Sequence, residues 1–158
     1  GNLSQSLGIK NPDELEVALP SIMEQIIMDK EVDVTKGIIH HKEGLDLMPC
    51  NIDLSGVDVS LVNAMSREFV LKTYVESMRE FYDYILIDCM PSLGMITVNS
   101  LTASDSVLIP VQAAYLPVKD LEQLIMRIIH SKSLFYWFIL KVFDIQMVNS
   151  LFVYETVG

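Results

Sequence analysis

Residues 82–94 read YDYILIDCMPSLG, an apolar run that ends in an acidic residue. Residues 84–87 are all apolar, which is typical of a strand buried on both faces of a parallel sheet. Asp88 then falls at the carboxyl end of that strand, where open α/β sheets bind their ligands. A plainer role is also open, because an aspartate after a strand can cap the turn that follows. This segment alone leaves both interpretations of Asp88 standing.

The segments around this strand alternate between helical and strand patterns. Residues 57–81 contain no Gly or Pro and carry an approximate apolar stripe, so they predict one long amphipathic helix. Residues 106–111 predict a second buried strand, and residues 94–103 and 118–129 predict helices. This alternation indicates an α/β fold with a doubly wound, mostly parallel sheet and right-handed crossovers.

The front of the chain predicts short helices and a hairpin. An Asn-Pro-Asp turn at residues 11–13 leads into a helical pattern with Asp13 as its N-cap, and Pro20 is expected to divide that pattern into two short helices. Residues 38–40 and 45–48 predict two short strands around a Lys-Glu-Gly turn.

The composition excludes several classes of protein. The chain has 158 residues, with 11 Lys+Arg against 21 Asp+Glu and a net charge of −10. This charge argues against a nucleic-acid-binding surface spread over the whole chain, although a local basic site remains open. Cys50 and Cys89 lie far apart and outside any Cys-x-x-Cys pair, so we predict neither a zinc site nor a disulfide, and we expect a cytoplasmic setting. The apolar residues 134–143 are about half of the ~20 that a membrane-spanning helix needs.

The last part of the chain differs from the rest. Residues 1–126 hold 8 Lys+Arg and 19 Asp+Glu, whereas residues 127–158 hold 3 and 2, together with seven of the thirteen aromatic side chains. We therefore treat residues 127–158 as a divergent apolar tail. Two explanations stay open: a genuine strand at residues 139–144, with the tail pairing beside the strand at 107–112, or a truncated or frame-displaced coding sequence.

Residues 82–94 resemble the signature of the ParA/MinD family of deviant Walker-type ATPases, and of its ParA-type partition ATPases in particular. That signature is an aromatic residue and Asp, an apolar strand, Asp, and then Pro-Ser-Leu-Gly. Residues 44–51 are similar to the family's strand that ends in proline, residues 99–112 to its next helix and strand, and residues 1–4 to the segment after its second strand. The resemblance covers about residues 1–126 in order. It implies a P-loop NTPase-like fold that is incomplete at the N-terminus, with those residues as a partial ATPase domain.

The resemblance also implies roles for single residues. Asp88 matches the Walker B aspartate, which in the family holds the Mg²⁺ of ATP, usually through water; a carboxylate suits this hard cation. Pro91, Ser92, Leu93 and Gly94 match the switch II turn, whose backbone responds to the γ-phosphate. Gly94 also has a structural interpretation, as a permissive residue where a helix starts.

The sequence departs from the family in one essential part. The phosphate-binding loop, Lys-Gly-Gly-x-Gly-Lys-Thr, does not occur in the 158 residues, and neither does Gly-x-x-x-x-Gly-Lys-Ser/Thr. Because Gly1 falls inside the family's pattern and is not Met, we expect that the first strand, loop, first helix and second strand were cut from the front. We therefore expect no tight binding of Mg-ATP and no measurable ATP hydrolysis by this chain alone. We also expect marginal stability, since a sheet edge and an apolar face would be left exposed.

For the parent protein, the resemblance implies Mg-ATP hydrolysis, an ATP-dependent homodimer, non-specific DNA binding, and stimulation by a centromere-binding, ParB-like partner. These activities would serve chromosome or plasmid partitioning in the cytoplasm, at the nucleoid and without a membrane. Two alternatives remain: a non-catalytic interaction module derived from this fold, and a MinD-like ATPase that places the cell-division site. The Pro-Ser-Leu-Gly turn and the strand at 107–112 favour partitioning.

Two further groups of residues have both a functional and a structural interpretation. His40, His41 and Glu43 could suggest metal ligands, but adjacent strand residues point to opposite faces and no further ligand follows, so a solvated turn is favoured. Cys89 could be a reactive thiol, but a buried strand end favours an inert, small apolar side chain.

Overall fold

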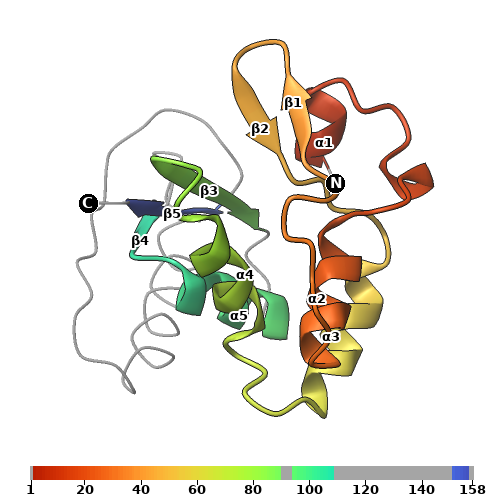
Figure 1. Cartoon of the computed structure of the whole chain (residues 1–158), viewed down its shortest axis with the longest axis vertical. Coiled ribbons are helices and arrows are strands. Elements are labelled where there is room, and N and C mark those ends of the chain that lie inside the picture. Colours follow the sequence, from red (N-terminus) through yellow and green to blue (C-terminus); the bar gives the residue numbers. More distant parts are fainter. Residues whose placement is uncertain (1, 90–93, 109–150, 157–158) are drawn as a thin grey trace, which may run out of the picture. The chain divides into compact units, whose positions relative to one another are not determined.

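The computed structural model describes residues 2–89, 94–108 and 151–156, and the chain divides into two compact units (Figure 1). The N-terminal unit is Gly1–Met78 and the C-terminal unit is Arg79–Gly158. In chain order, the N-terminal unit contains α1 (Asn2–Ser6), the 3-10 helix η1 (Pro12–Glu14), α2 (Leu19–Ile27), β1 (Ile39–His41), β2 (Leu45–Leu47), α3 (Leu54–Val62) and α4 (Val70–Met78). The described elements of the C-terminal unit are β3 (Tyr84–Cys89), α5 (Met95–Ala103), β4 (Ser106–Leu108) and β5 (Leu151–Thr156).

The predicted hairpin is confirmed. Strands β1 and β2 pair antiparallel, with His40 opposite Asp46 and His41 opposite Leu45. Gly44 closes the turn at φ +81°, and its N–H donates to the carbonyl of His41 at 3.0 Å. Each strand is three residues long. The start of β2 is as predicted, and the other three strand ends differ from the prediction by one residue each.

The first helical pattern is divided into two short helices, as predicted, but the break lies at residues 15–18 and Pro20 lies inside the first turn of α2. A proline is tolerated there, since the N–H that it lacks would have no partner within the helix. The hydroxyl of Ser21 accepts a hydrogen bond from the N–H of Ala18 at 3.4 Å and donates to the carbonyl of Ala18 at 2.8 Å, which helps to fix the start of α2. The N–H of Leu19 donates to the carbonyl of Pro49 at 2.9 Å, tying α2 to the segment after β2.

The expected N-cap role of Asp13 is wrong. Asp13 lies inside η1, and its Oδ1 accepts a hydrogen bond from the backbone N–H of Ile52 at 2.9 Å. The carboxylate therefore joins η1 to the approach of α3, thirty-nine residues further along the chain.

The single long helix predicted for residues 57–81 is also wrong. The structure has two nine-residue helices, α3 and α4, separated by residues 63–69. Ser66 takes a φ of +50°, a left-handed conformation that a continuous α-helix cannot contain. The guanidinium of Arg67 donates to the carbonyl of Val62 at 2.9 Å, which satisfies one of the acceptors at the end of α3. Because the break uses neither Gly nor Pro, the usual helix-ending signals did not predict it.

Helix α2 packs against both α3 and α4 and so lies at the centre of the N-terminal unit. Figure 1 shows α2 and α3 side by side. The buried apolar side chains of this unit are Ala18, Ile22, Met23, Leu47, Val57, Leu61, Val70, Leu71, Tyr74, Val75 and Met78.

The described sheet of the C-terminal unit has three strands in the order β3, β5, β4. Strand β5 is antiparallel to both neighbours, so β3 and β4 run in the same direction, as the α/β prediction requires. Strand β5, which the sequence did not predict, pairs with β4. The proposed tail strand, residues 139–144, lies outside the described residues, as does the helix predicted at 118–129, so the pairing of that strand stays a prediction.

Strand β3 was expected to be buried on both faces, and this is wrong. Its side chains alternate, with Ile85, Ile87 and Cys89 on the more buried side, while Tyr84 and Leu86 are exposed. Helix α5 packs against β3, and the described residues of this unit provide no second helix for the opposite side. Within residues 2–89, 94–108 and 151–156, no helix has the length and apolar character needed to cross a membrane.

Candidate functional site

The carboxyl end of β3 carries Asp88 and Cys89 on opposite sides of the strand. Asp88 lies on the exposed side together with Tyr84 and Leu86, whereas the side chain of Cys89 is buried. Partial desolvation of the Asp88 carboxyl raises its pKa above the ordinary value of 3.8. A carboxylate that is partly desolvated but still accessible is suited to bind a cation, because a positive charge would favour its ionised form.

The thiol of Cys89 is not poised to react. Burial raises its pKa to about 11, and the negative charge of Asp88 adds to this rise, while the interaction with the Ser100 hydroxyl lowers the pKa in part. Since the thiolate is the reactive form, a thiol with this pKa is almost fully protonated near neutral pH. This supports the interpretation of Cys89 as an inert, small apolar side chain.

Helix α5 begins close in sequence to these residues, with Gly94 as its N-cap. Gly94 has φ −75° and ψ 171°, an extended conformation open to any residue, and its carbonyl accepts a bond from the N–H of Val98 at 3.4 Å. Gly94 therefore lies where the helix starts, as its structural interpretation has it, but its backbone does not require glycine; its role in the switch stays a prediction. Pro91, Ser92 and Leu93 lie outside the described residues.

Three buried polar side chains of α5 were missed by the sequence reasoning. Thr97, Asn99 and Ser100 are all buried, and Asn99 is fully enclosed. The Asn99 amide donates to the carbonyl of Met95 at 3.0 Å and the Ser100 hydroxyl donates to the carbonyl of Ile96 at 2.9 Å. A Thr-x-Asn-Ser run inside an apolar helical segment was the available signal, since buried polar groups must find partners.

The residues at the end of β3 fit one part of a magnesium-nucleotide site. Asp88 offers the hard oxygen ligand that Mg²⁺ prefers. The donors that would cradle phosphates have no counterpart, because the 158 residues contain no Gly-x-x-x-x-Gly-Lys-Ser/Thr sequence. Across the described part of the chain, no group of three or more His, Cys, Asp or Glu is arranged to hold a metal ion. Asp88 could thus contribute to such a site without completing it.

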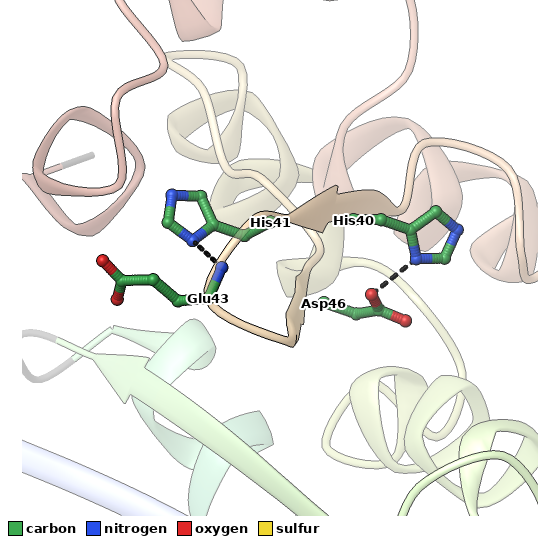
Figure 2. A network of polar contacts seen from close by, with 4 residues as sticks. All are labelled: His40, His41, Glu43 and Asp46. Carbon is green, nitrogen blue, oxygen red and sulfur yellow. Dashed lines mark hydrogen bonds and ion pairs between the residues drawn. The ribbon is translucent and has the colours of Figure 1, made fainter.

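The hairpin histidines make separate local contacts. Figure 2 shows the rings of His40 and His41 directed away from each other, as expected for adjacent residues of a strand. His40 Nδ1 lies 2.5 Å from Asp46 Oδ1 across the hairpin. His41 Nδ1 accepts a hydrogen bond from the backbone N–H of Glu43 at 3.3 Å, within the turn. Both rings therefore act as local structural contacts at an exposed turn.

The chain matches a known family over most of its length. The model of the family described as "AAA domain" matches residues 1–135. The chain is 43% identical over 129 residues to the sporulation initiation inhibitor protein Soj of Bacillus subtilis, an alignment that covers 79% of this chain and 47% of Soj. It is 40% identical over 126 residues to the chromosome partitioning protein ParA of Myxococcus xanthus, covering 78% of this chain and 42% of that protein. The chain thus spans about half the length of the curated relatives that it matches.

Solved structures show the same relationship at the level of the fold. Cobyrinic acid a,c-diamide synthase from Mycobacterium smegmatis, with bound ADP and magnesium, matches with a TM-score of 0.76 and 33% identity, covering 90% of this chain and 55% of the synthase. The same enzyme with an ATP analogue and magnesium matches with a TM-score of 0.75 and 32% identity. These likenesses confirm the predicted P-loop NTPase-like α/β fold, and with the family match they place this chain in the ParA-type ATPase family.

Proposed function

We propose that this chain is a segment of a ParA-type ATPase that acts in chromosome or plasmid partitioning, and that Asp88 is its Walker B aspartate. The observation that carries the proposal is the position of Asp88, the second-last residue of β3, which carries an accessible, partly desolvated carboxyl. It is supported by the relatives Soj and ParA, and by the similar fold of cobyrinic acid a,c-diamide synthase, which was solved with bound ADP and magnesium.

In the parent protein, magnesium would supply positive charge against the phosphates of ATP, which is the main requirement of phosphoryl transfer to water. Asp88 would orient that ion, through water, from a fixed point on the sheet. The extended strand β3 holds the carboxylate in place, and Cys89 anchors the same strand end by burial on the opposite face. Pro91, Ser92, Leu93 and Gly94 would form the switch II turn that links the γ-phosphate to the start of α5.

The same proposal extends to partners. The parent would form an ATP-dependent homodimer, bind DNA without sequence specificity, and respond to a centromere-binding, ParB-like protein in the cytoplasm at the nucleoid. The net charge of −10 does not oppose DNA binding by the parent, because this chain spans only about half of the matched relatives.

A chimera tests the proposal. The part of Bacillus subtilis Soj that matches this chain would be replaced by the corresponding residues of this chain, leaving the remainder of Soj in place. We expect the chimera to hydrolyse ATP in the presence of Mg²⁺, and the 158-residue chain alone to show neither hydrolysis nor micromolar binding of Mg-ATP by calorimetry. A folded chimera without nucleotide binding would contradict the proposal, and so would micromolar binding by the chain alone.

A further inference from the structure

Helix α3 carries apolar side chains on two opposite sides. Val57 and Leu61 are fully buried and form the side that packs within the N-terminal unit. Val59 is displaced by about 200° from each of them around the helix, and 69% of its surface is exposed. Val62, one turn further along, is 55% exposed. The outer side of α3 is therefore apolar and accessible.

This apolar surface continues beyond both ends of the helix. Ile52, just before α3, is 72% exposed, and Met65, just after it, is 94% exposed. We call Ile52, Val59, Val62 and Met65 the α3 strip. Single exposed apolar residues are normal on protein surfaces, but these four lie along one helix and just beyond its two ends.

A groove between α2 and α3 borders the strip. It is lined by Pro20, Ser21, Glu24, Ile52, Asp53 and Gly56. Gly56 forms part of this lining without a side chain, and a Cβ built there would meet no atom within 4 Å. Ile52 belongs to both features, so the groove and the strip form one surface.

The charges around the groove are acidic, and the basic Arg67 lies at the far end of the strip, where its guanidinium donates to the carbonyl of Val62. Residues 11–29 and 43–66, which include α2 and α3, contain nine Asp or Glu and no Lys or Arg. Glu24 and Asp53 line the groove, and Asp58 directly precedes Val59 on α3. An occupant with Lys or Arg beside an apolar face would complement both the shape and the charge of this surface.

We propose that the α3 strip and its groove bind a basic amphipathic helix of a partner protein. From Ile52 to Met65 the strip is long enough for a helix of about 13 residues, with apolar side chains at i, i+3, i+4 and i+7 and Lys or Arg along the edges. A second copy of this chain is disfavoured, because a symmetric contact would bring the acidic edges together. An anionic membrane is disfavoured for the same electrostatic reason. The inference is independent of the proposed ATPase role.

The test uses the full 158-residue chain and a labelled helical peptide of about 18 residues, with Leu on one face and Lys on the flanks. A matched peptide carries Glu in place of every Lys. Fluorescence anisotropy is expected to show micromolar binding of the Lys peptide that weakens several-fold as salt rises from about 50 to about 300 mM, with the Glu peptide at least tenfold weaker. Val59→Ser and Val62→Ser should each weaken binding of the Lys peptide at least fivefold, and Glu24→Gln should reduce its salt dependence.

Leu45→Ser is the matched control, because Leu45 is an exposed apolar residue of β2 in the same unit and lies outside the strip. Circular dichroism of each variant would verify that it folds. The proposal is overturned if both peptides bind equally, or if Val59→Ser has no greater effect than Leu45→Ser. It is also overturned if Val59→Ser abolishes self-association or binding to anionic vesicles, because the surface would then serve a second copy or a membrane.

Discussion

Alanine substitutions at three glycines of the N-terminal unit distinguish the cost of a left-handed backbone from the cost of steric overlap. Gly37 and Gly44 both have a left-handed backbone, with φ +90° and +81°. A Cβ at Gly44 would meet nothing within 4 Å, whereas a Cβ at Gly37 would lie 2.9 Å from Val17 Cγ1 and 3.0 Å from the Val17 carbonyl oxygen. Gly56 lies inside α3 with a right-handed backbone and open space around it. Alanine at Gly44 therefore tests backbone strain alone, and alanine at Gly37 tests strain together with overlap. Alanine at Gly56 introduces neither cost.

The expected changes in the free energy of unfolding follow from these differences. Left-handed backbone costs a residue with a Cβ about 1–2 kcal/mol, and the reduced entropy of the unfolded chain offsets about 0.4–1 kcal/mol of this. Gly44→Ala should therefore destabilise by about 1 kcal/mol. Gly37→Ala adds overlap with a backbone atom, worth about 1–3 kcal/mol, so it should destabilise by about 2–4 kcal/mol. Gly56→Ala should stabilise by about 0.5–1 kcal/mol, because alanine favours the helix.

Urea denaturation followed by far-ultraviolet circular dichroism measures all three variants. Amide exchange of Ile22 and Met23 in the centre of α2 would report on the N-terminal unit specifically. Equal losses for Gly37→Ala and Gly44→Ala would refute the position of Val17 against Gly37. A loss of stability for Gly56→Ala would refute the helical conformation of α3 or the open space beside it.

Three further predictions concern single side chains. Leu61→Ala should destabilise the chain by about 2–5 kcal/mol in urea denaturation, because Leu61 is fully buried. Val59→Ala should change stability by less than about 0.5 kcal/mol, because Val59 is exposed. Equal effects of the two substitutions would contradict the assigned faces of α3. Asp88→Asn should raise the melting temperature at neutral pH. The pKa of Asp88 in the folded chain lies above its unfolded value of 3.8, so the folded chain binds more protons between these two values and loses stability as pH rises through them. The increase in melting temperature caused by Asp88→Asn should therefore vanish below about pH 4. An increase that persists below pH 4 would contradict this explanation. Cys89, with its pKa of about 11, should react with iodoacetamide at pH 8 about two orders of magnitude more slowly in the native chain than in urea, and comparable rates would show that the thiol is not buried.

The sequence predicted those elements whose signals are local. The hairpin followed from its turn, α2 from its helical pattern, and β3 from its apolar run ending in Asp88. The opposite orientations of His40 and His41 followed from the period of two in a strand.

The errors arose where tertiary contacts overrule local pattern. The break between α3 and α4 depends on the left-handed Ser66 and on Arg67 reaching back to Val62, neither of which has a helix-ending signature. Asp13 looked like a helix cap because the Asn-Pro-Asp pattern is local, but its partner is Ile52, far along the chain. The exposed side of β3 could not be predicted from an apolar run, because such a run does not say which elements cover each face.

The candidate site was also predicted only in part. The position of Asp88 at a strand end came from residues 84–88 themselves, and the desolvation that raises its pKa required the folded chain. The burial of Thr97, Asn99 and Ser100 was missed because it depends on how α5 packs, whereas the bonds of Asn99 and Ser100 go to carbonyls of the same helix.

The ATPase activity of the Soj chimera with Asp88 replaced tests the central claim most directly. Asp88→Asn keeps the size of the side chain and removes its charge, so the account predicts a loss of Mg²⁺-dependent hydrolysis of at least about 100-fold, together with a raised Mg²⁺ requirement. Asp83→Asn, five residues earlier and before β3, is the control and should leave the rate within about threefold. A chimera that hydrolyses ATP equally well with Asn at position 88 would contradict the assignment of Asp88 as the residue that holds magnesium.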